Sequence, residues 1–453
     1  MAHPIQTQAV VYITQRFASL ATLFYLLSFV AYIEYRLSRG SKLKTWSFYA
    51  ASLFSAALGM LTKEITFTLP VMVALYEFMF LRGDRKKRIA LLLPVFLTAL
   101  IIPFTLLMTK GSVTGISGID ESMKTLAAAP TVSRSDYLLT QFRVIVTYLR
   151  LLFKPVNQNL DYDYQVYHSF FTPPVFFSFL LLLCLFGMAV YLAFKSRIDN
   201  PGNPAYLTGR YRWIAPVPRT PRELRLTAFG IFWFFITLSM ESSIIPIADV
   251  IFEHRVYLPS VGFLIGIVTL VFVLARKAGG RLPYGAGVTV SVLAMAVFFM
   301  ACAAYARNLV WKDELTLWQD ASEKSPLKFR PHYNLGLNYA ELGRTADAIR
   351  EYETAIRIDP SNSEAHNNLG IAYAMRGEFD KAVTEIQLAL QLNPLSSNAY
   401  NNLGSIYANM RLWDRAIECF KTAIALKPED VTFQNRLARA YEEKKAFDAN
   451  VRK

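Results

Sequence analysis

Long apolar runs fill the first part of the chain, and shorter helical patterns follow. The apolar runs predict eight helices near residues 17–35, 45–61, 65–81, 89–108, 173–194, 226–240, 256–275 and 284–306. About 20 apolar residues cross the hydrocarbon core of a bilayer, and the shorter runs need their flanking residues to do so. We therefore expect an all-α fold in which residues 1–310 form a multipass membrane domain of about eight transmembrane helices.

One further stretch, 136–153, has a different pattern. Arg143, Thr147, Arg150 and Lys154 recur at helical spacing, and apolar side chains fill the rest of the helix. This pattern predicts a basic amphipathic helix that lies at the outer membrane interface. A tilted spanning helix is the alternative.

Charge separates the chain into two parts and orients the first. Residues 1–310 hold 29 Lys and Arg against 14 Asp and Glu, and residues 311–453 hold 19 against 20. Four connecting segments, 36–44, 82–88, 195–225 and 276–281, contain 19 of the 29 basic residues. Because such loops face the cytoplasm, we expect the other connections and everything after residue 306 on the outer side. The basic excess is therefore a topology signal, and we expect no nucleic-acid partner.

Composition narrows the class of protein. Hydrophobic residues make up 53% of the chain and charged residues only 18%, whereas soluble domains carry roughly 25% charge. An ordinary soluble enzyme is excluded. The three cysteines are too few and too scattered for a disulfide framework or a metal site. We expect no metal and no cofactor.

From residue 331 the sequence repeats with a period of 34. Asn-Leu-Gly recurs at Asn334, Asn368 and Asn402, and Tyr, Ala and Pro positions follow in step. This pattern is typical of tetratricopeptide repeats, which stack into an α-solenoid. We expect full repeats at 331–364, 365–398 and 399–432. A half repeat should precede them and a polar terminal cap should follow, so that the repeat domain covers 311–453.

The repeated asparagines are candidate peptide-binding residues. Asn334, Asn368 and Asn402 occupy a first-helix position that typically faces the concave groove of such arrays. An amide side chain there can both donate to and accept from a peptide backbone. The alternative is that these asparagines only fit the repeat consensus. We predict that they bind a protein or peptide partner.

Ionisable residues at the outer ends of the apolar runs carry the candidate chemistry, because charge at membrane depth is costly. They form four groups: Thr62-Lys63-Glu64, Asp161-Tyr162-Asp163, Glu241 and Glu253-His254-Arg255. Basic groups can hold a lipid-linked phosphate, and a carboxylate can deprotonate an acceptor hydroxyl. The predicted ligands of a donor lipid phosphate are Lys63, His254, Arg255, Arg143 and Arg150. Glu64 and Glu253 are the candidates for the carboxylate.

Structural interpretations compete with these assignments. Lys63 and Glu64 can form an interfacial ion pair, and His254 and Arg255 can hold lipid headgroups. Glu77, near the cytoplasmic end of its helix, is interpreted as a structural partner of the basic cluster Arg82–Arg88.

Several motifs resemble a known family when taken in order. They are His3-Pro4-Ile5-Gln6-Thr7-Gln8-Ala9-Val10, Gln15-Arg16, Leu61-Thr62-Lys63-Glu64, Tyr76-Glu77 and Glu253-His254-Arg255-Val256-Tyr257-Leu258-Pro259-Ser260-Val261-Gly262, followed by the repeats. Together they resemble the multipass TPR-containing membrane proteins of bacteria. Those proteins are similar to the transmembrane-and-TPR protein O-mannosyltransferases of the eukaryotic secretory pathway, which have the GT-C fold.

The resemblance implies a function. It implies transfer of a sugar from a polyprenyl-phosphate donor to protein hydroxyls on the outer membrane face. It also implies that the main catalytic carboxylate lies in an outer loop upstream of His3. We therefore expect this chain to lack that loop and about three membrane helices, and we assign no residue as catalytic by resemblance.

Location and rival functions follow from the same expectation. The expected location is a bacterial inner membrane with the repeats in the periplasm, or an endoplasmic reticulum membrane with lumenal repeats. The alternative function is a non-catalytic membrane-anchored TPR scaffold that recruits partner proteins. A transporter is disfavoured because the membrane half shows no paired internal repeats.

Overall fold

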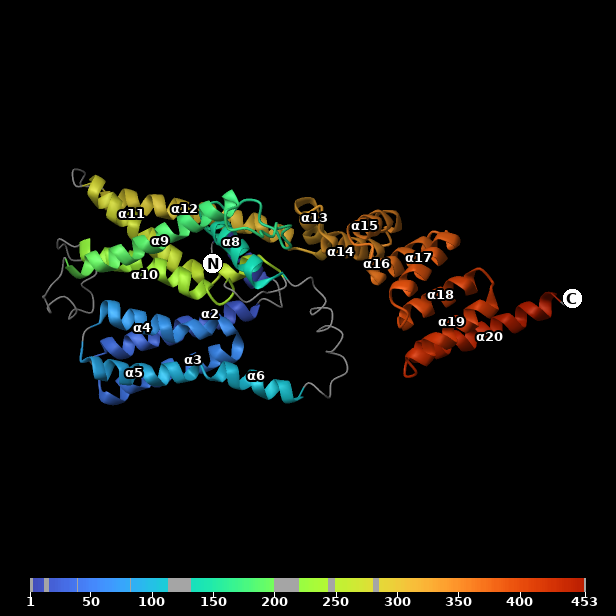
Figure 1. Cartoon of the computed structure of the whole chain (residues 1–453), viewed down its shortest axis with the longest axis horizontal. Coiled ribbons are helices and arrows are strands. Elements are labelled where there is room, and N and C mark those ends of the chain that lie inside the picture. Colours follow the sequence, from blue (N-terminus) through green and yellow to red (C-terminus); the bar gives the residue numbers. More distant parts are fainter. Residues whose placement is uncertain are drawn as a thin grey trace. The chain divides into compact units, whose positions relative to one another are not determined.

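The computed structural model describes residues 3–11, 16–38, 40–81, 83–112, 132–198, 220–242, 249–279 and 285–451. Every regular element within these ranges is a helix (Figure 1), so the all-α prediction is confirmed for this part of the chain. By their contacts the residues form two units. The first comprises Met1–Leu160 and Tyr164–Leu309, and the second comprises Asp161–Asp163 and Val310–Lys453.

The first unit contains the predicted apolar helices. Its α-helices are α1 (Thr7–Val11), α2 (Arg16–Leu37), α3 (Lys42–Thr62), α4 (Leu69–Phe80), α5 (Arg85–Thr98), α6 (Ile101–Ser112), α8 (Arg134–Phe153), α9 (Pro173–Ile198), α10 (Thr220–Leu238), α11 (Pro259–Gly279) and α12 (Gly285–Val310). Short 3-10 helices are η1 (Pro4–Gln6), η3 (Glu64–Thr68) and η6 (Glu253–Val256). Each predicted apolar run corresponds to one or two of these elements.

Prolines explain two departures from the predicted helix bounds. The run 89–108 is divided into α5 and α6, with a turn at Ala99–Leu100. Pro103 lacks an N–H, and its ring clashes with the carbonyl four residues earlier, which is that of Ala99. The run 65–81 begins as the 3-10 helix η3, and Pro70 lies in the first turn of α4, where a missing N–H costs nothing.

Within the described residues, four segments are long and apolar enough to cross a membrane: Arg16–Leu37, Arg85–Thr105, Pro173–Ser196 and Gly287–Val310. Many large apolar side chains on them face outward, such as Leu93 and Phe298, which are 59% and 64% exposed. A surface of this kind requires an apolar environment or a partner. Arg39, Arg82, Arg281 and residues 199–219, which belong to the predicted basic segments, lie outside the described residues.

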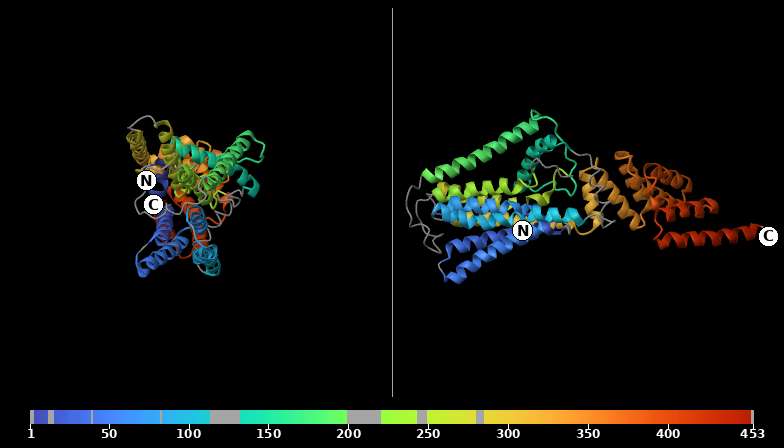
Figure 2. Two further views of the ribbon diagram at one scale, coloured as in Figure 1. Left: turned by 90° about the vertical axis from the view of Figure 1, so that its left-hand side faces the viewer. Right: turned by 60° about the horizontal axis from the view of Figure 1, so that its bottom comes forward.

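The long helices of the first unit run alongside one another (Figures 1 and 2). Tyr25 and Phe29 of α2 pack edge-on against Trp233 of α10 in a buried cluster. Helices α10 and α11 cross at glycines. A Cβ on Gly230 would lie 2.5 Å from the carbonyl oxygen of Gly262. This close approach positions the segments at the ends of α10 and α11 that carry Glu241 and Arg255.

The second unit is a series of helix pairs (Figure 1). Its helices are α13 (Glu314–Lys324), α14 (Phe329–Glu341), α15 (Thr345–Ile358), α16 (Ser363–Met375), α17 (Phe379–Leu392), α18 (Ser397–Asn409), α19 (Trp413–Leu426) and α20 (Val431–Val451). The glycine of each Asn-Leu-Gly lies against the second helix of its pair. A Cβ on Gly336 would lie 2.7 Å from the ring of Tyr352. The pairs begin at Phe329, Ser363 and Ser397, two residues before the predicted repeat boundaries.

Candidate functional site

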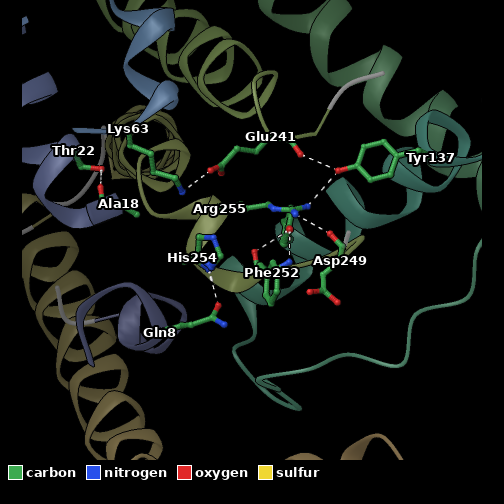
Figure 3. Close-up of polar contacts among 11 residues, drawn as sticks. Gln8, Ala18, Thr22, Lys63, Tyr137, Glu241, Asp249, Phe252, His254 and Arg255 are labelled. Carbon is green, nitrogen blue, oxygen red and sulfur yellow. Dashed lines mark hydrogen bonds and ion pairs between the residues drawn. The ribbon is translucent and has the colours of Figure 1, made fainter. Parts of the chain in front are cut away.

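The segment at His3–Val11 lies against η6, about 250 residues later in the chain. Gln8 Oε1 accepts a hydrogen bond from the backbone N–H of His254 at 2.9 Å (Figure 3). Gln6 Nε2 donates to Ser260 Oγ at 3.1 Å. His3 Nδ1 accepts from the N–H of Ile5, so its Nε2 donates to the carbonyl of Leu152 at 2.8 Å. The structure thus joins two of the motifs that carried the family resemblance.

Arg255 is buried, with an exposed fraction of 2%. Its Nη2 donates to the carbonyl of Asp249 at 2.7 Å, and its Nη1 donates to that of Val250 at 3.1 Å. Nη1 also lies 3.4 Å from Tyr137 Oη (Figure 3). The guanidinium therefore organises the backbone around residues 249–256 and carries a positive charge into the interior.

Helix α8 supports the same segment through side chains that the sequence analysis did not assign. Tyr148 Oη donates to the carbonyl of Phe252 at 2.9 Å, and Gln141 Nε2 donates to that of Val250 at 3.0 Å. Tyr137, Gln141 and Tyr148 are all buried. The sequence pattern that could have predicted this row is the spacing of four residues from Tyr137 to Gln141 and of seven from Gln141 to Tyr148. The prediction concentrated on the arginines of this helix and overlooked that row.

Lys63 forms an ion pair with Glu241, with 2.7 Å between Nζ and Oε1 (Figure 3). Both side chains are largely buried, whereas Glu64 is exposed. Tyr137 Oη donates to the backbone carbonyl of Glu241 at 3.1 Å, which links this pair to Arg255. The carboxylate partner of Lys63 in this structure is therefore Glu241.

His254 is a neutral member of the cluster. Burial, together with the charges of Lys63 and Arg255, lowers the pKa of His254 to about 2. Lys63 and Arg255 supply two positive charges and Glu241 supplies one negative charge, so these three leave one net positive charge. Glu253, which is buried on the same short helix as Arg255, adds a second negative charge nearby.

Four buried polar atoms near this cluster have no hydrogen-bond partner within the described ranges. They are Glu241 Oε2, Ser242 Oγ, His254 Nδ1 and Thr66 Oγ1. Ser242 follows Glu241 directly, and the N–H of Thr66 donates to the carbonyl of Lys63. Because an unsatisfied buried polar atom costs about 1–3 kcal/mol, a polar ligand or water beside any of these atoms would be stabilising.

Glu253 holds a loop. Its carboxylate is buried, and it accepts hydrogen bonds from Gln158 Nε2 at 2.8 Å and from the N–H of Asn159 at 2.9 Å. These bonds attach the segment after α8 to η6. In this structure Glu253 is therefore a structural carboxylate.

Arg143 and Arg150 lie on α8 beside Tyr164. The hydroxyl of Tyr164 is 2.9 Å from Thr147 Oγ1. The pKa of Tyr164 is raised, mainly by burial. The hydrogen bond to Thr147 and the charges of both arginines oppose part of this rise. No contact among the described residues joins either arginine to Lys63, His254 or Arg255.

Two further predicted groups lie elsewhere. Glu77 is fully buried, and it pairs with Arg36 at 2.8 Å and with Arg88 at 3.0 Å, which confirms that it is a structural partner of the basic cluster. Asp161 belongs to the second unit, where it pairs with Lys328 Nζ at 2.6 Å. Ser325 Oγ donates to the carbonyl of Asp161 at 2.7 Å.

The repeated asparagines lie on the first helices of successive pairs and are all half-buried. Asn368 Nδ2 donates to Tyr333 Oη at 3.0 Å, and Asn402 Nδ2 donates to Asn367 Oδ1 at 3.0 Å. The backbone carbonyl of Asn334 accepts a hydrogen bond from Asn338 Nδ2. Two of the three amides thus form a polar chain between neighbouring repeats. Each of these two retains a second N–H for a ligand.

An apolar hollow adjoins one of these amides. It has a volume of about 160 Å³ and is lined by Leu337, Ala340, Glu341, Tyr352, Asn368, Ile371, Ala372 and Met375. Its lining comes from α14 and α16, with Tyr352 from α15. The hollow places an apolar surface directly beside the Asn368 side chain.

Comparisons with known proteins support the repeat assignment. A family model described as TPR repeat matches residues 336–377, and models described as tetratricopeptide repeat match 363–396 and 397–430. The crystal structure of MamA protein is similar at 29% identity and a TM-score of 0.28, covering 30% of this chain and 75% of that one. By the three family models, the second unit carries tetratricopeptide repeats.

The similarity to one curated relative extends beyond the repeats. Protein O-mannosyl-transferase TMTC4 of Mus musculus is 23% identical over 377 residues, which is 77% of this chain and 47% of that protein. Protein O-mannosyl-transferase F38B6.6 of Caenorhabditis elegans is 28% identical over 126 residues, which is 26% of this chain and 17% of that protein. The chain spans less than half the length of these relatives.

Proposed function

We propose that this chain acts in transferring a sugar from a polyprenyl-phosphate donor to hydroxyl groups of proteins, and that its repeats hold the acceptor. The observation that carries the proposal is the buried basic cluster of Lys63, Arg255 and Glu241. The 77% of the chain that is similar to the mouse O-mannosyl-transferase necessarily includes residues 241–255. The similar part thus includes two of the three residues of this cluster, Glu241 and Arg255.

Lys63 is the proposed ligand of the donor phosphate. A phosphate accepts charge-assisted hydrogen bonds as a carboxylate does, and it has more acceptor oxygens. It can therefore replace Glu241 at Nζ of Lys63. Arg255 contributes charge and holds the loop, since its Nη atoms already donate to backbone carbonyls. His254 lies nearby as a neutral imidazole, and Arg143 and Arg150 stay proposals for a more distant part of the lipid headgroup.

The proposal also needs a carboxylate that acts on the acceptor hydroxyl. Glu64 is exposed next to Lys63, so a substrate hydroxyl can reach it. Glu253 requires its loop bonds to Gln158 and Asn159 to break first. We therefore favour Glu64 over Glu253.

Acceptor binding is assigned to Asn334, Asn368 and Asn402. Amides in a row can hold a peptide backbone without demanding a particular side-chain sequence. We further propose that residues 1–310 span a membrane about eight times. The repeats would then lie on the outer side, in a periplasm or an endoplasmic reticulum lumen. The four long apolar segments support part of that arrangement.

Binding of a polyprenyl phosphate to the full chain in detergent micelles tests the donor assignment. Lys63→Met removes the proposed ligand but leaves Glu241 as an unpaired buried carboxylate. The double variant Lys63→Met/Glu241→Gln is therefore the cleaner test. Loss of a charge-assisted hydrogen bond, worth about 1.5–3 kcal/mol, predicts binding weaker by roughly tenfold or more.

The control for this experiment is Lys44→Met, an exposed lysine near the start of α3. It should bind the lipid phosphate as the unaltered chain does. Lys63→Arg should retain part of the binding. If the folded double variant binds as tightly as the unaltered chain, Lys63 belongs to a purely structural ion pair.

A non-catalytic scaffold is the second candidate function. The observation that favours it is that Arg255 and Glu253 already hold loops through buried hydrogen bonds. A scaffold requires peptide binding by the repeats but no binding of polyprenyl phosphate. The unaltered chain alone distinguishes the two functions, since only the transferase proposal predicts a saturable lipid-phosphate site.

A further inference from the structure

Helices α3 and α5 both begin among basic residues that the proposed donor site does not use. The segments 34–46 and 77–88 together contain nine Lys and Arg against three Asp and Glu. Arg36 and Arg88 are already paired with the buried Glu77. Five further basic side chains are exposed and form no ion pair among the described residues: Lys42, Lys44, Arg85, Lys86 and Lys87. This end of the first unit therefore carries uncompensated positive charge.

The two helices are joined near these beginnings. Tyr49 of α3 donates its hydroxyl hydrogen to the carbonyl of Leu91 on α5 at 2.7 Å (Figure 1). The chain turns back after α3 and again after α4, so α3 and α5 run in the same direction. The first residues of α3 and α5 therefore lie at the same end of the unit, on either side of a seam that the Tyr49–Leu91 bond defines.

Helical spacing selects two of the lysines. Lys42 precedes Tyr49 by seven residues and Lys87 precedes Leu91 by four, which places each lysine within about 40° of the joined faces at 3.6 residues per turn. Lys44 and Lys86 each precede the joined positions by five residues, which is about 140° away. Lys42 and Lys87 therefore lie along the seam, whereas Lys44 and Lys86 point away from it.

An aromatic cluster marks the depth of these lysines. Trp46 lies between Lys42 and Tyr49 on α3, and its ring packs edge-on against Tyr49 with 5.7 Å between centroids. It also contacts Tyr35 of α2 at 5.5 Å, yet 54% of Trp46 is exposed. Trp and Tyr rings are typical of the level at which lipid headgroups meet the acyl chains. Lys42, one turn before Trp46, therefore lies at headgroup level.

Apolar side chains continue from this level along both helices. Phe54 on α3 and Ile89 and Leu93 on α5 are large and exposed. Contiguous exposed apolar surface of this kind marks a place for an apolar partner. A pair of cations followed by exposed apolar side chains matches the two ends of a phospholipid, its phosphate and its acyl chains.

We propose that the seam between α3 and α5 binds a phospholipid of net negative charge from the cytoplasmic leaflet. Its headgroup phosphate lies between Lys42 and Lys87, and its acyl chains cover the apolar side chains beyond Trp46. Basic residues at a membrane surface attract such lipids. This inference rests on the proposed membrane insertion of residues 1–310. It does not depend on sugar transfer, because Lys63 lies at the opposite end of α3.

The test measures binding of a fluorescent phosphatidylglycerol to the full chain in detergent micelles. Binding should be saturable, and unlabelled phosphatidylglycerol should compete at least tenfold more effectively than phosphatidylcholine or inorganic phosphate. Lys42→Gln/Lys87→Gln removes both cations of the seam. It should weaken binding roughly tenfold or more, because each lysine beside an anionic lipid contributes about fivefold.

Lys44→Gln/Lys86→Gln is the matched control. It removes the same number of charges from the same two helices, on faces that point away from the seam, and should weaken binding less than about threefold. All four lysines are exposed, so both double variants should melt as the unaltered chain does.

The outcomes separate a defined lipid site from general attraction to basic charge. If both double variants lose affinity equally, the seam is not a site and the inference is wrong. If phosphatidylcholine or inorganic phosphate competes as well as phosphatidylglycerol, the inference is also wrong. Release of the unaltered chain from membranes by an alkaline wash would refute the proposed membrane insertion and this inference together. A chain that stays in membranes but binds no phosphatidylglycerol refutes this inference alone.

Discussion

His254 illustrates how one buried side chain makes the first unit sensitive to acid. Its pKa is lowered to about 2 by burial and by the charges of Lys63 and Arg255, whereas an unfolded histidine titrates near 6.5. Below pH 6.5 the unfolded chain takes up a proton at this histidine that the folded chain does not. The contribution of His254 to the free energy of unfolding is therefore fully present above pH 6.5 and decreases as the pH falls. The contribution of this group falls by about 1.4 kcal/mol per pH unit.

Thermal unfolding of the detergent-solubilised chain at pH 7 and pH 5 checks this prediction. His254→Gln removes the titrating group and should reduce the loss of stability between the two pH values. His168→Gln is the control, because His168 is exposed and its only described partner is Asp136. Equal acid sensitivity of the unaltered chain and His254→Gln would contradict the assignment.

At the scale of the element, the crossing of α10 and α11 depends on glycine. Gly230→Ala places a methyl group against the backbone of Gly262 and Gly266. Forced separation of packed helices costs about 1–3 kcal/mol. Because these helices lead to Glu241 and Arg255, the variant should also weaken any ligand binding at Lys63. The melting temperatures of Gly230→Ala and of the control Gly187→Ala on α9 are compared by thermal unfolding. A Cβ on Gly187 meets nothing within 4 Å, so the control should melt as the unaltered chain does. Equal melting temperatures would show that α10 and α11 can move apart freely.

The same scale shows what the sequence could predict. The apolar runs predicted the positions of the helices, because helix length and hydropathy are local properties of the sequence. The period of 34 similarly placed the repeat asparagines on successive first helices. The partners of Lys63 and His254 were missed because Glu241 and Gln8 lie 178 and 246 positions away in the sequence. Only the helix crossings and the docking of His3–Val11 bring such residues together, and no local pattern encodes those contacts.

At the scale of the whole molecule, the distribution of basic residues predicts the side of the membrane on which the repeats lie. Ser196 is buried and bonded to Arg225, so Leu43 and Leu395, which are 84% and 76% exposed, are better labelling sites. In a chain with Cys184, Cys302 and Cys419 replaced by Ala, an impermeant maleimide on intact cells should label Leu395→Cys and not Leu43→Cys. Permeabilised cells should show both labelled. The reverse pattern in intact cells would invert the proposed orientation.

The buried carboxylate of Glu77 has a consequence for the order in which the first unit assembles during synthesis. Arg36 leaves the ribosome before Glu77, and Arg88 leaves after it. Tyr32 and Arg36 of α2 are therefore present when α4 forms, and they can receive the carboxylate as soon as the two helices meet. Arg88 then joins from α5 and also binds the backbone carbonyl of Glu77. One buried carboxylate thereby joins three helices, α2, α4 and α5, and its partner on α2 is synthesised before its partner on α5.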